Sequence, residues 1–257
     1  LATALPHVGN FVIKMRTGNS AKGVYYADNP VEVIARVNQL IDKYELSPDR
    51  YPQIEERVIG EGWGCSALFW HGEHVADFTH RRLREKVPTG GTSTLREAAV
   101  HEGLREAALR ILSSLGWHGL AMCEFKVCPR TGKFWFIEVN PRMWGSISLA
   151  INSGVEFPYL NWLCAAKGPV AARQYLSECV RSERHRARWL FGDLLMGAKS
   201  LMELKVSESV STLTERTDSV DDFYWDDPLA FVGEVAFYFI SALGKRSLNP
   251  EEKGMVK

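Results

Sequence analysis

The sequence predicts an α+β protein, in which antiparallel hairpins and helices follow one another along the chain. Two apolar runs, residues 10–14 and 24–27, flank a loop of small residues and are expected to form a hairpin. A second pair of runs, residues 120–127 and 133–139, flanks the turn sequence Cys-Pro-Arg-Thr-Gly. From about residue 170 the spacing of apolar residues becomes mainly helical.

The elements after the first hairpin follow from turn and cap signals. The loop of that hairpin covers residues 16–23, and Lys14 ends its first strand. Asn29 followed by Pro30 predicts the start of a helix with apolar residues at helical spacing. A strand is then expected over residues 54–60.

The middle of the chain predicts two more strands and a long helix. The two strands meet at the turn His71-Gly72, and the second carries two arginines, Arg82 and Arg84, which share a face at strand spacing. The apolar pattern of residues 94–115 predicts one amphipathic helix.

The hairpin near residue 130 brings two carboxylates together. With a loop at residues 130–132, the paired residues have numbers that sum to 262, which places Glu124 opposite Glu138. Directly opposed side chains lie about 5 Å apart at Cβ, and two carboxylates at that distance repel unless a cation or a shared proton lies between them. A divalent metal would explain the pair.

The strand that carries Glu138 also supplies an amide. Period two places Phe134, Phe136, Glu138 and Asn140 on one face, and Pro141 ends the strand. Two carboxylates and an amide oxygen form a hard-oxygen cluster that suits Mg²⁺, which keeps part of its coordination for water or phosphate. The alternative without a ligand is that these residues are the solvent-facing end of a strand.

Composition narrows the functional class. The 257 residues contain 31 basic and 31 acidic side chains, which argues against broad phosphate neutralisation of a nucleic acid. The five cysteines give no paired zinc-ligand spacing, and the longest apolar stretch near the end is interrupted by Glu234. We therefore expect a cytoplasmic protein with no membrane or nucleic-acid partner. Because the chain enters a strand soon after a start without methionine, we also expect an upstream segment of the same polypeptide.

The order of these motifs resembles the ATP-grasp superfamily, in particular its carbamoyl-phosphate-synthetase-like carboxylate–amine ligases. The resemblance rests on Lys14, the loop Arg-Thr-Gly-Asn-Ser-Ala-Lys-Gly, the strand Glu-Glu-Arg-Val-Ile-Gly-Glu-Gly, the loop Pro-Thr-Gly-Gly-Thr-Ser-Thr, and above all Phe-Ile-Glu-Val-Asn-Pro-Arg. It covers about residues 8–165. It implies the ATP-grasp fold, in which two α+β subdomains clasp ATP, here followed by a helical C-terminal part.

The resemblance also implies roles for individual residues. Lys14 would contact the phosphates of ATP and act in catalysis, Glu124, Glu138 and Asn140 would hold Mg²⁺, with Mn²⁺ as an alternative, and Arg142 would stabilise the transferring phosphoryl group. The remaining ATP contacts would come from the loop and from the strand that meets the adenine and ribose: Gly18, Ser20, Gly23, Glu55, Glu56, Val58 and Glu61.

The acceptor substrate is expected beside the second arginine-rich strand. A substrate carboxylate or acyl phosphate would bind Arg82 or Arg84 and the loop at Gly90 and Gly91, and a solvated basic strand is the alternative. The implied domain order is a small subdomain over 1–60, a large subdomain with the metal site over 61–168, and a mainly helical region over 169–257.

The resulting functional hypothesis is an ATP- and Mg²⁺-dependent ligase. It activates a carboxylate as an acyl phosphate, which a small-molecule amine then attacks to form a carbon–nitrogen bond. Two alternatives remain open: a carbamoyl-phosphate-synthetase-like or carboxylase-like enzyme that uses bicarbonate, and a non-catalytic nucleotide-binding module of a larger synthetase. A homodimer is left open as the oligomeric state.

Overall fold

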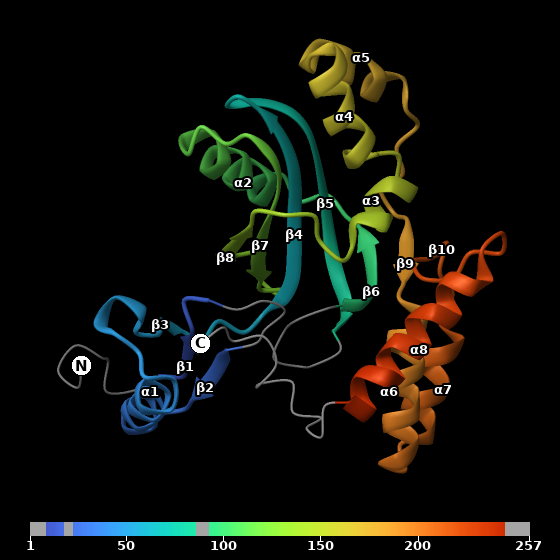
Figure 1. Cartoon of the computed structure of the whole chain (residues 1–257). Coiled ribbons are helices and arrows are strands. Elements are labelled where there is room, and N and C mark those ends of the chain that lie inside the picture. The colour runs from blue at the N-terminus through green and yellow to red at the C-terminus, as the bar shows by residue number, and fades with distance from the viewer. Residues whose placement is uncertain (1–8, 18–22, 86–92, 245–257) are drawn as a thin grey trace. The chain divides into compact units, whose positions relative to one another are not determined.

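The computed structural model of the chain describes residues 9–17, 23–85 and 93–244 (Figure 1). The strands are β1 (Phe11–Lys14), β2 (Val24–Ala27), β3 (Gln53–Glu56), β4 (Glu61–Trp70), β5 (Glu73–Glu85), β6 (Ser93–Ala98), β7 (Gly119–Val127), β8 (Phe134–Asn140), β9 (Arg186–Arg188) and β10 (Ser219–Val220). The helices are α1 (Pro30–Tyr44), the 3-10 turn η1 (Pro48–Arg50), α2 (Glu102–Ser114), α3 (Ile147–Asn152), α4 (Phe157–Lys167), α5 (Pro169–Glu178), α6 (Leu190–Met202), α7 (Val206–Thr214) and α8 (Pro228–Gly244).

The chain packs as two compact units. Of the described residues, one unit comprises those up to Val58 together with Tyr238–Gly244, and the other comprises those from Ile59 to Phe237. Both mix helices and sheet, so the α+β class is confirmed. The finer division at residues 60 and 168 stays a prediction.

The first unit is built on a three-stranded antiparallel sheet with the order β2-β1-β3. Helix α1 begins where the sequence predicts, because the Asn29 side chain accepts a hydrogen bond of 3.0 Å from the Glu32 backbone N–H and Pro30 occupies the first turn. Its apolar residues pack on Phe11 and Ile13 of β1. This packing leaves the other face of the sheet, which carries Lys14, for polar contacts.

The second unit contains a seven-stranded sheet with the order β10-β9-β6-β5-β4-β7-β8. The pairs are antiparallel except β9 with β10. Helix α2 covers one face through Leu104, Ala108 and Leu112, which pack on alternate residues of β4 and β7. Helices α3, α4 and α5 supply the core on the other face (Figure 1). Each face of the sheet therefore packs in its own hydrophobic core.

The expected helix over residues 94–115 is wrong in its first part. Residues 93–98 form β6, and α2 begins only at Glu102, where the His101 ring accepts a hydrogen bond of 3.3 Å from the Leu104 N–H. Glu97 of β6 pairs with arginines on both neighbouring strands, at 2.5 Å from Arg81 and 2.8 Å from Arg186. Partners on both edges of β6 outweigh a local helical pattern, since tertiary context overrides propensity.

The C-terminal region is helical but also contributes strands. β9 and β10 extend the large sheet, and α6 and α7 pack together beside that edge. Of the helices in the described ranges, none has the length and apolarity needed to cross a membrane.

Candidate functional site

The β7–β8 hairpin places Glu124 opposite Glu138, as the sequence register predicts. The hairpin loop is one residue longer than expected, because the Cys128 N–H donates to the Lys133 carbonyl at 2.8 Å and the Gly132 N–H donates to the Cys128 carbonyl at 2.9 Å. Gly132 adopts a φ of 69° in this loop. Side chains of directly paired residues lie on the same face of a sheet. The two carboxylates therefore share the face that also carries Met122, which belongs to the core under α3 and α4.

A β-bulge corrects the period-two argument for this strand. The register shifts after the Glu124–Glu138 pair, so that Phe125 pairs with Phe136 and Ile137 is the extra residue. Phe134 consequently packs in the α2 core together with Val139. The two phenylalanines thus lie on the face opposite to Glu138 and Asn140, although all four residues have even numbers.

Asn140 links the two carboxylates. Its Nδ2 donates to Glu124 Oε1 at 3.0 Å and to Glu138 Oε1 at 3.2 Å, while its Oδ1 accepts from Arg142 Nη2 at 3.2 Å. Asn140 is buried, whereas Glu138 and Arg142 are exposed. The four residues predicted from the motif therefore form one connected group at the end of β8.

This group suits a divalent cation. Nδ2 lies within hydrogen-bond distance of both carboxylates, which is where a positive charge would relieve their repulsion. With a cation there, Asn140 would contribute through Oδ1, so its amide would have to rotate from the present orientation. Within the described ranges no group of three or more His, Cys, Asp or Glu side chains could hold a metal. The donor set of two carboxylates and one amide matches a Mg²⁺ that takes further ligands from phosphate and water.

Arg82 joins the group from β5. Its Nη2 lies 2.7 Å from Glu124 Oε1, and its Nη1 lies 3.4 Å from Glu85 Oε1. Burial opposes the charged form, but Glu124 and Glu85 outweigh burial and raise the pKa of the Arg82 guanidinium above its ordinary value. Arg82 is therefore a fixed cation against a candidate metal ligand.

Two glycines make room for this arrangement. A Cβ on Gly62 would lie 2.9 Å from Arg82 Cδ, and one on Gly64 would lie 2.4 Å from the His80 ring. β4 therefore carries no side chain at the two positions where Arg82 and His80 of β5 lie against it. The alternation Gly-Trp-Gly beside a basic strand is a signal that the sequence interpretation did not use.

His80 is a further residue of the site that the sequence interpretation did not include. The ring is 1% exposed, and Ser146 Oγ lies 3.3 Å from Nε2. Burial, followed by the charges of Arg82 and Arg96, lowers the pKa of His80 to about 3, so the ring is neutral at physiological pH. A neutral histidine beside Arg82 adds a hydrogen-bonding group without a competing charge.

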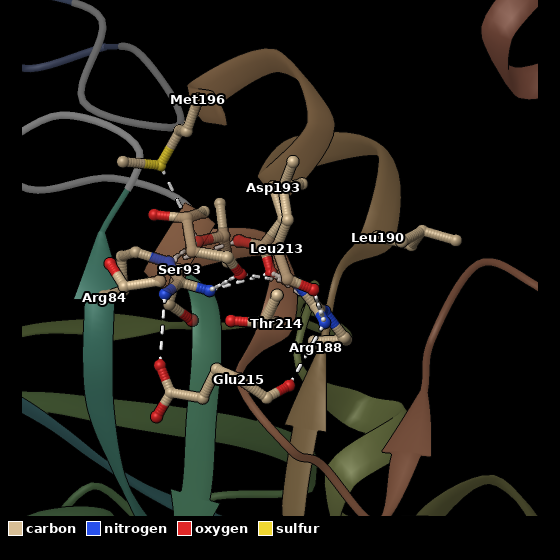
Figure 2. A network of polar contacts seen from close by, with 12 residues as sticks. Arg84, Ser93, Arg188, Leu190, Asp193, Met196, Leu213, Thr214 and Glu215 are labelled. Atoms are coloured by element: carbon tan, nitrogen blue, oxygen red, sulfur yellow. Dashed lines mark hydrogen bonds and ion pairs between the residues drawn. The ribbon is translucent and has the colours of Figure 1, made fainter. Parts of the chain in front are cut away.

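Arg84 does not belong to this group. Register shifts place Arg82 opposite Arg96 but Arg84 opposite Leu95, so the two arginines lie on different faces of the sheet. Figure 2 shows Arg84 with Asp193 and Glu215. The expectation that Arg82 and Arg84 share a face is wrong, because a bulge at the end of β5 reverses the alternation.

The remaining predicted nucleotide contacts are divided between the units. In the first unit, Lys14 Nζ lies 2.6 Å from Glu55 Oε2, while Glu56 and Val58 follow at the end of β3 and beyond it. In the second unit, Glu61 pairs with Val127 in the alternation of the α2 face. The structure does not bring the Glu61 side chain together with Glu124.

The glycine-loop residues are described only in part. Gly23 has a φ of 75°, and its carbonyl accepts a hydrogen bond of 2.8 Å from the Met15 N–H, which closes the base of the first hairpin. Gly18, Ser20, Gly90 and Gly91 lie outside the described residues. Their expected ligand contacts stay predictions.

The chain resembles known proteins in sequence and in fold. Residues 35–157 match the model of the carbamoyl-phosphate synthase L chain ATP-binding domain. The chain also resembles the biotin carboxylase of Campylobacter jejuni, with a TM-score of 0.52 and 14% identity over 72% of this chain and 42% of that chain. The matched span contains the Glu124, Glu138 and Asn140 group. The matched domain model and the shared fold agree with the ATP-grasp resemblance expected from the sequence.

Carboxylases are also among the proteins that this chain resembles. It is 25% identical to acetyl-CoA carboxylase 2 of Arabidopsis thaliana over 167 residues, which are 62% of this chain and 6% of the relative. It resembles the biotin carboxylase domain of 2-oxoglutarate carboxylase from Hydrogenobacter thermophilus, with a TM-score of 0.50 and 15% identity over 65% of this chain and 38% of that chain. The chain thus spans 6% of the acetyl-CoA carboxylase and less than half of each of the two solved chains.

Proposed function

We propose that this chain forms the nucleotide-binding and catalytic part of a ligase that uses ATP to activate a carboxylate group. The group of Glu124, Glu138, Asn140 and Arg142 carries the proposal, because it joins two paired carboxylates, an amide and an exposed guanidinium at one strand end. We assign Arg142 a role at the transferring phosphoryl group, which a site for nucleotide binding alone would not need. The cytoplasm, which supplies ATP, is the proposed compartment.

The side chains divide the work between binding and chemistry. Lys14 binds the phosphates of ATP, and Glu124, Glu138 and Asn140 hold Mg²⁺. When bound, Mg²⁺ neutralises phosphate charge and orients the phosphate chain. Arg142 contacts the phosphoryl group as charge builds up on it, which is the kind of fixed electrostatic contact that lowers a barrier. Phosphoryl transfer to an acceptor oxygen needs no nucleophilic side chain, so positioning is the main contribution of the protein.

Arg82 is the proposed acceptor residue. It lies on the same face as Glu124 and is held by Glu124 and Glu85, and a guanidinium suits a carboxylate or bicarbonate anion. The reaction then proceeds in two steps. A carboxylate oxygen attacks the γ-phosphorus and ADP leaves, and a nucleophilic amine attacks the resulting acyl phosphate and expels phosphate.

A second candidate uses bicarbonate as the phosphate acceptor. The observation that favours it is the presence of acetyl-CoA carboxylases and biotin carboxylase domains among the relatives. Bicarbonate is smaller than an organic acid but offers the same carboxylate edge, so Arg82, Arg142 and the metal ligands would have the same roles. The two candidates differ in the acceptor, not in the phosphoryl-transfer group.

Isotope transfer distinguishes the two acceptors. The chain, within its longer polypeptide if it has one, is incubated with Mg-ATP and either ¹⁸O-bicarbonate or ¹⁸O-labelled carboxylic acids with an amine, and the released phosphate is analysed by mass. We expect ¹⁸O in phosphate with one class of acceptor and a loss of both ADP and label in Glu138→Gln. ADP release without label with every acceptor would contradict carboxylate activation. Nucleotide binding without ADP release would favour the non-catalytic module.

A further inference from the structure

A hollow of about 470 Å³ lies between α2 and the β4–β5 hairpin. Its apolar lining includes Phe69 at the end of β4 and Leu109 on α2. His74 of β5 and three residues of α2, Glu106, Arg110 and Ser113, supply the polar lining. This volume falls in the range of small-molecule sites, which combine apolar walls with a few polar groups. The hollow belongs to the α2 side of the sheet, whereas Glu124 and Glu138 lie on the other face.

Glu106 and Arg110 on its wall are exposed charges at a spacing that normally gives an ion pair. A glutamate four residues before an arginine on a helix is the favourable order for such a contact. Within the described part of the chain neither side chain has an ion pair or a side-chain hydrogen bond, although the neighbouring Arg105 binds both Asp77 and Glu102. The hollow therefore carries one negative and one positive group that are not satisfied by each other.

The third polar group, His74, is held in a defined orientation. Its Nε2 lies 2.9 Å from Asp77 Oδ2, and its ring meets Phe69 edge-on at 5.6 Å between centroids. Asp77 in turn accepts two hydrogen bonds from Arg105, at 2.5 and 2.9 Å. His74 is thus a fixed part of the lining, although its buried Nε2 makes no hydrogen bond of good geometry.

We propose that this hollow binds a zwitterionic α-amino acid with an apolar side chain. The ammonium group would meet Glu106, the carboxylate would meet Arg110, and the apolar side chain would cover Phe69 and Leu109. A molecule with only one charge would leave either Glu106 or Arg110 without a partner, so both charges of the ligand are part of the recognition. The site is separate from the proposed ATP site and does not depend on it.

Calorimetric titration of the whole chain with three probes tests the proposal directly. L-leucine carries both charges, L-leucinamide lacks the carboxylate, and 4-methylpentanoate lacks the ammonium. We expect L-leucine to bind and each analogue to bind about tenfold more weakly or worse, since hydrogen bonds to charged groups contribute more than neutral ones. Absence of heat from L-leucine at about 20 mM, a concentration that would reveal even a millimolar Kd, would overturn the proposal, as would equal binding of leucinamide.

Two variants locate the binding. Arg110→Gln and Glu106→Gln should each weaken L-leucine binding by about tenfold, whereas Arg130→Gln, an exposed arginine on the β7–β8 loop, should leave it unchanged. Unchanged affinity in both α2 variants would contradict the site. The comparison of the three probes on the wild-type chain needs no variant and stands even if a substitution impairs folding.

Discussion

Two clusters of charged side chains lie on opposite faces of the large sheet and differ in how far the protein encloses them. The cluster around Asp193 is closed: its carboxylate has no exposed surface, and it accepts from Arg84 Nη2 at 2.8 Å and from Arg188 Nη2 at 2.6 Å (Figure 2). The cluster around Glu124 is open, because Glu138 and Arg142 are exposed at its rim. The closed cluster around Asp193 holds α6 and α7 on the sheet. The open cluster around Glu124 leaves the Glu138 and Arg142 side chains accessible to a ligand.

The two clusters also differ in what binds the charges. Arg188 donates further to the carbonyls of Thr212 and Leu213, at 2.8 and 3.2 Å, so its guanidinium is saturated by the protein. Glu124 and Glu138 are instead linked through the amide of Asn140, and Glu124 also pairs with Arg82 at 2.7 Å. A buried ion pair costs desolvation and gives little net stability, but removing one partner is expensive. This asymmetry predicts that the closed cluster affects stability and the open one affects chemistry.

The largest expected effect is on the closed cluster. Asp193→Asn should lower the free energy of unfolding by about 3–5 kcal/mol, because Arg84 and Arg188 are then left buried without their counter-charge. Chemical denaturation measures the change, and Glu203→Gln, which breaks only exposed contacts with lysines, is the control and should show no measurable loss. A similar small loss in both variants would remove the distinction between closed and open clusters.

The next effect separates catalysis from binding. Arg142→Ala should lower turnover by about 10²-fold and change ATP affinity only a few-fold, since only contacts stronger in the transition state accelerate the chemical step. Lys14→Ala should mainly weaken ATP binding, because its ammonium contacts phosphates in both states. Calorimetric ATP binding and single-turnover ADP formation give the comparison. If affinity and rate fall together in both variants, the proposed division of roles fails.

A third effect concerns the pH dependence of stability and the ion pair between Asp77 and Arg105. Burial raises the pKa of Asp77, but the nearby His74 ring and the hydrogen bonds from Arg105 outweigh burial and lower it from 3.8 to about 2. Asp77 therefore takes up a proton at a lower pH in the native state than in the unfolded chain. The stabilisation that its ionised carboxylate provides is complete above about pH 4 and is lost as the pH falls towards 2. One pKa unit corresponds to about 1.4 kcal/mol, so roughly 2 kcal/mol is involved.

Urea unfolding at several pH values measures this contribution. Asp77→Asn should be less stable than wild type at pH 6, and the difference should shrink between pH 4 and pH 2. A difference that stays constant over this range would mean that Asp77 acts through packing and not through its charge.

The smallest effect is expected at the centre of the open cluster. Asn140→Asp keeps an oxygen ligand for the metal but loses the Nδ2 donor that now links Glu124 and Glu138. We expect turnover to fall by only a few-fold at saturating Mg²⁺, with a higher Mg²⁺ requirement because three adjacent carboxylates repel one another without the cation. Magnesium titration of the turnover rate measures this, and a complete loss of activity would contradict an oxygen-ligand role.

The predicted opposition of Glu124 and Glu138 is confirmed, but the hairpin loop alone does not fix it. Next to the loop the paired residue numbers sum to 261, and the bulge at Ile137 restores the predicted sum of 262. The helix start at Asn29 and Pro30 was local. The helix start succeeded because it depended on a few neighbouring residues, whereas the carboxylate pair needed the bulge as well.

The errors arose where a non-local pairing decides the structure. Nothing in the sequence shows a bulge, yet one bulge moves Phe136 to the face opposite Glu138 and another separates Arg84 from Arg82. Residues 93–98 look helical locally and become a strand because β5 and β9 flank them. The partner of Arg84, Asp193, lies 109 positions later in the chain, beyond the reach of any local pattern.

The most direct test of the account is the affinity of the chain for Mn²⁺ in the presence of a non-hydrolysable ATP analogue. Electron paramagnetic resonance counts free Mn²⁺ and needs no turnover. We predict that Glu138→Gln weakens Mn²⁺ binding by about tenfold or more, the size seen when a metal-site partner is lost, with unfolding unchanged. The exposed control Glu73→Gln should bind Mn²⁺ like wild type. Wild-type Mn²⁺ affinity in Glu138→Gln would contradict the assignment of the open cluster as a metal site.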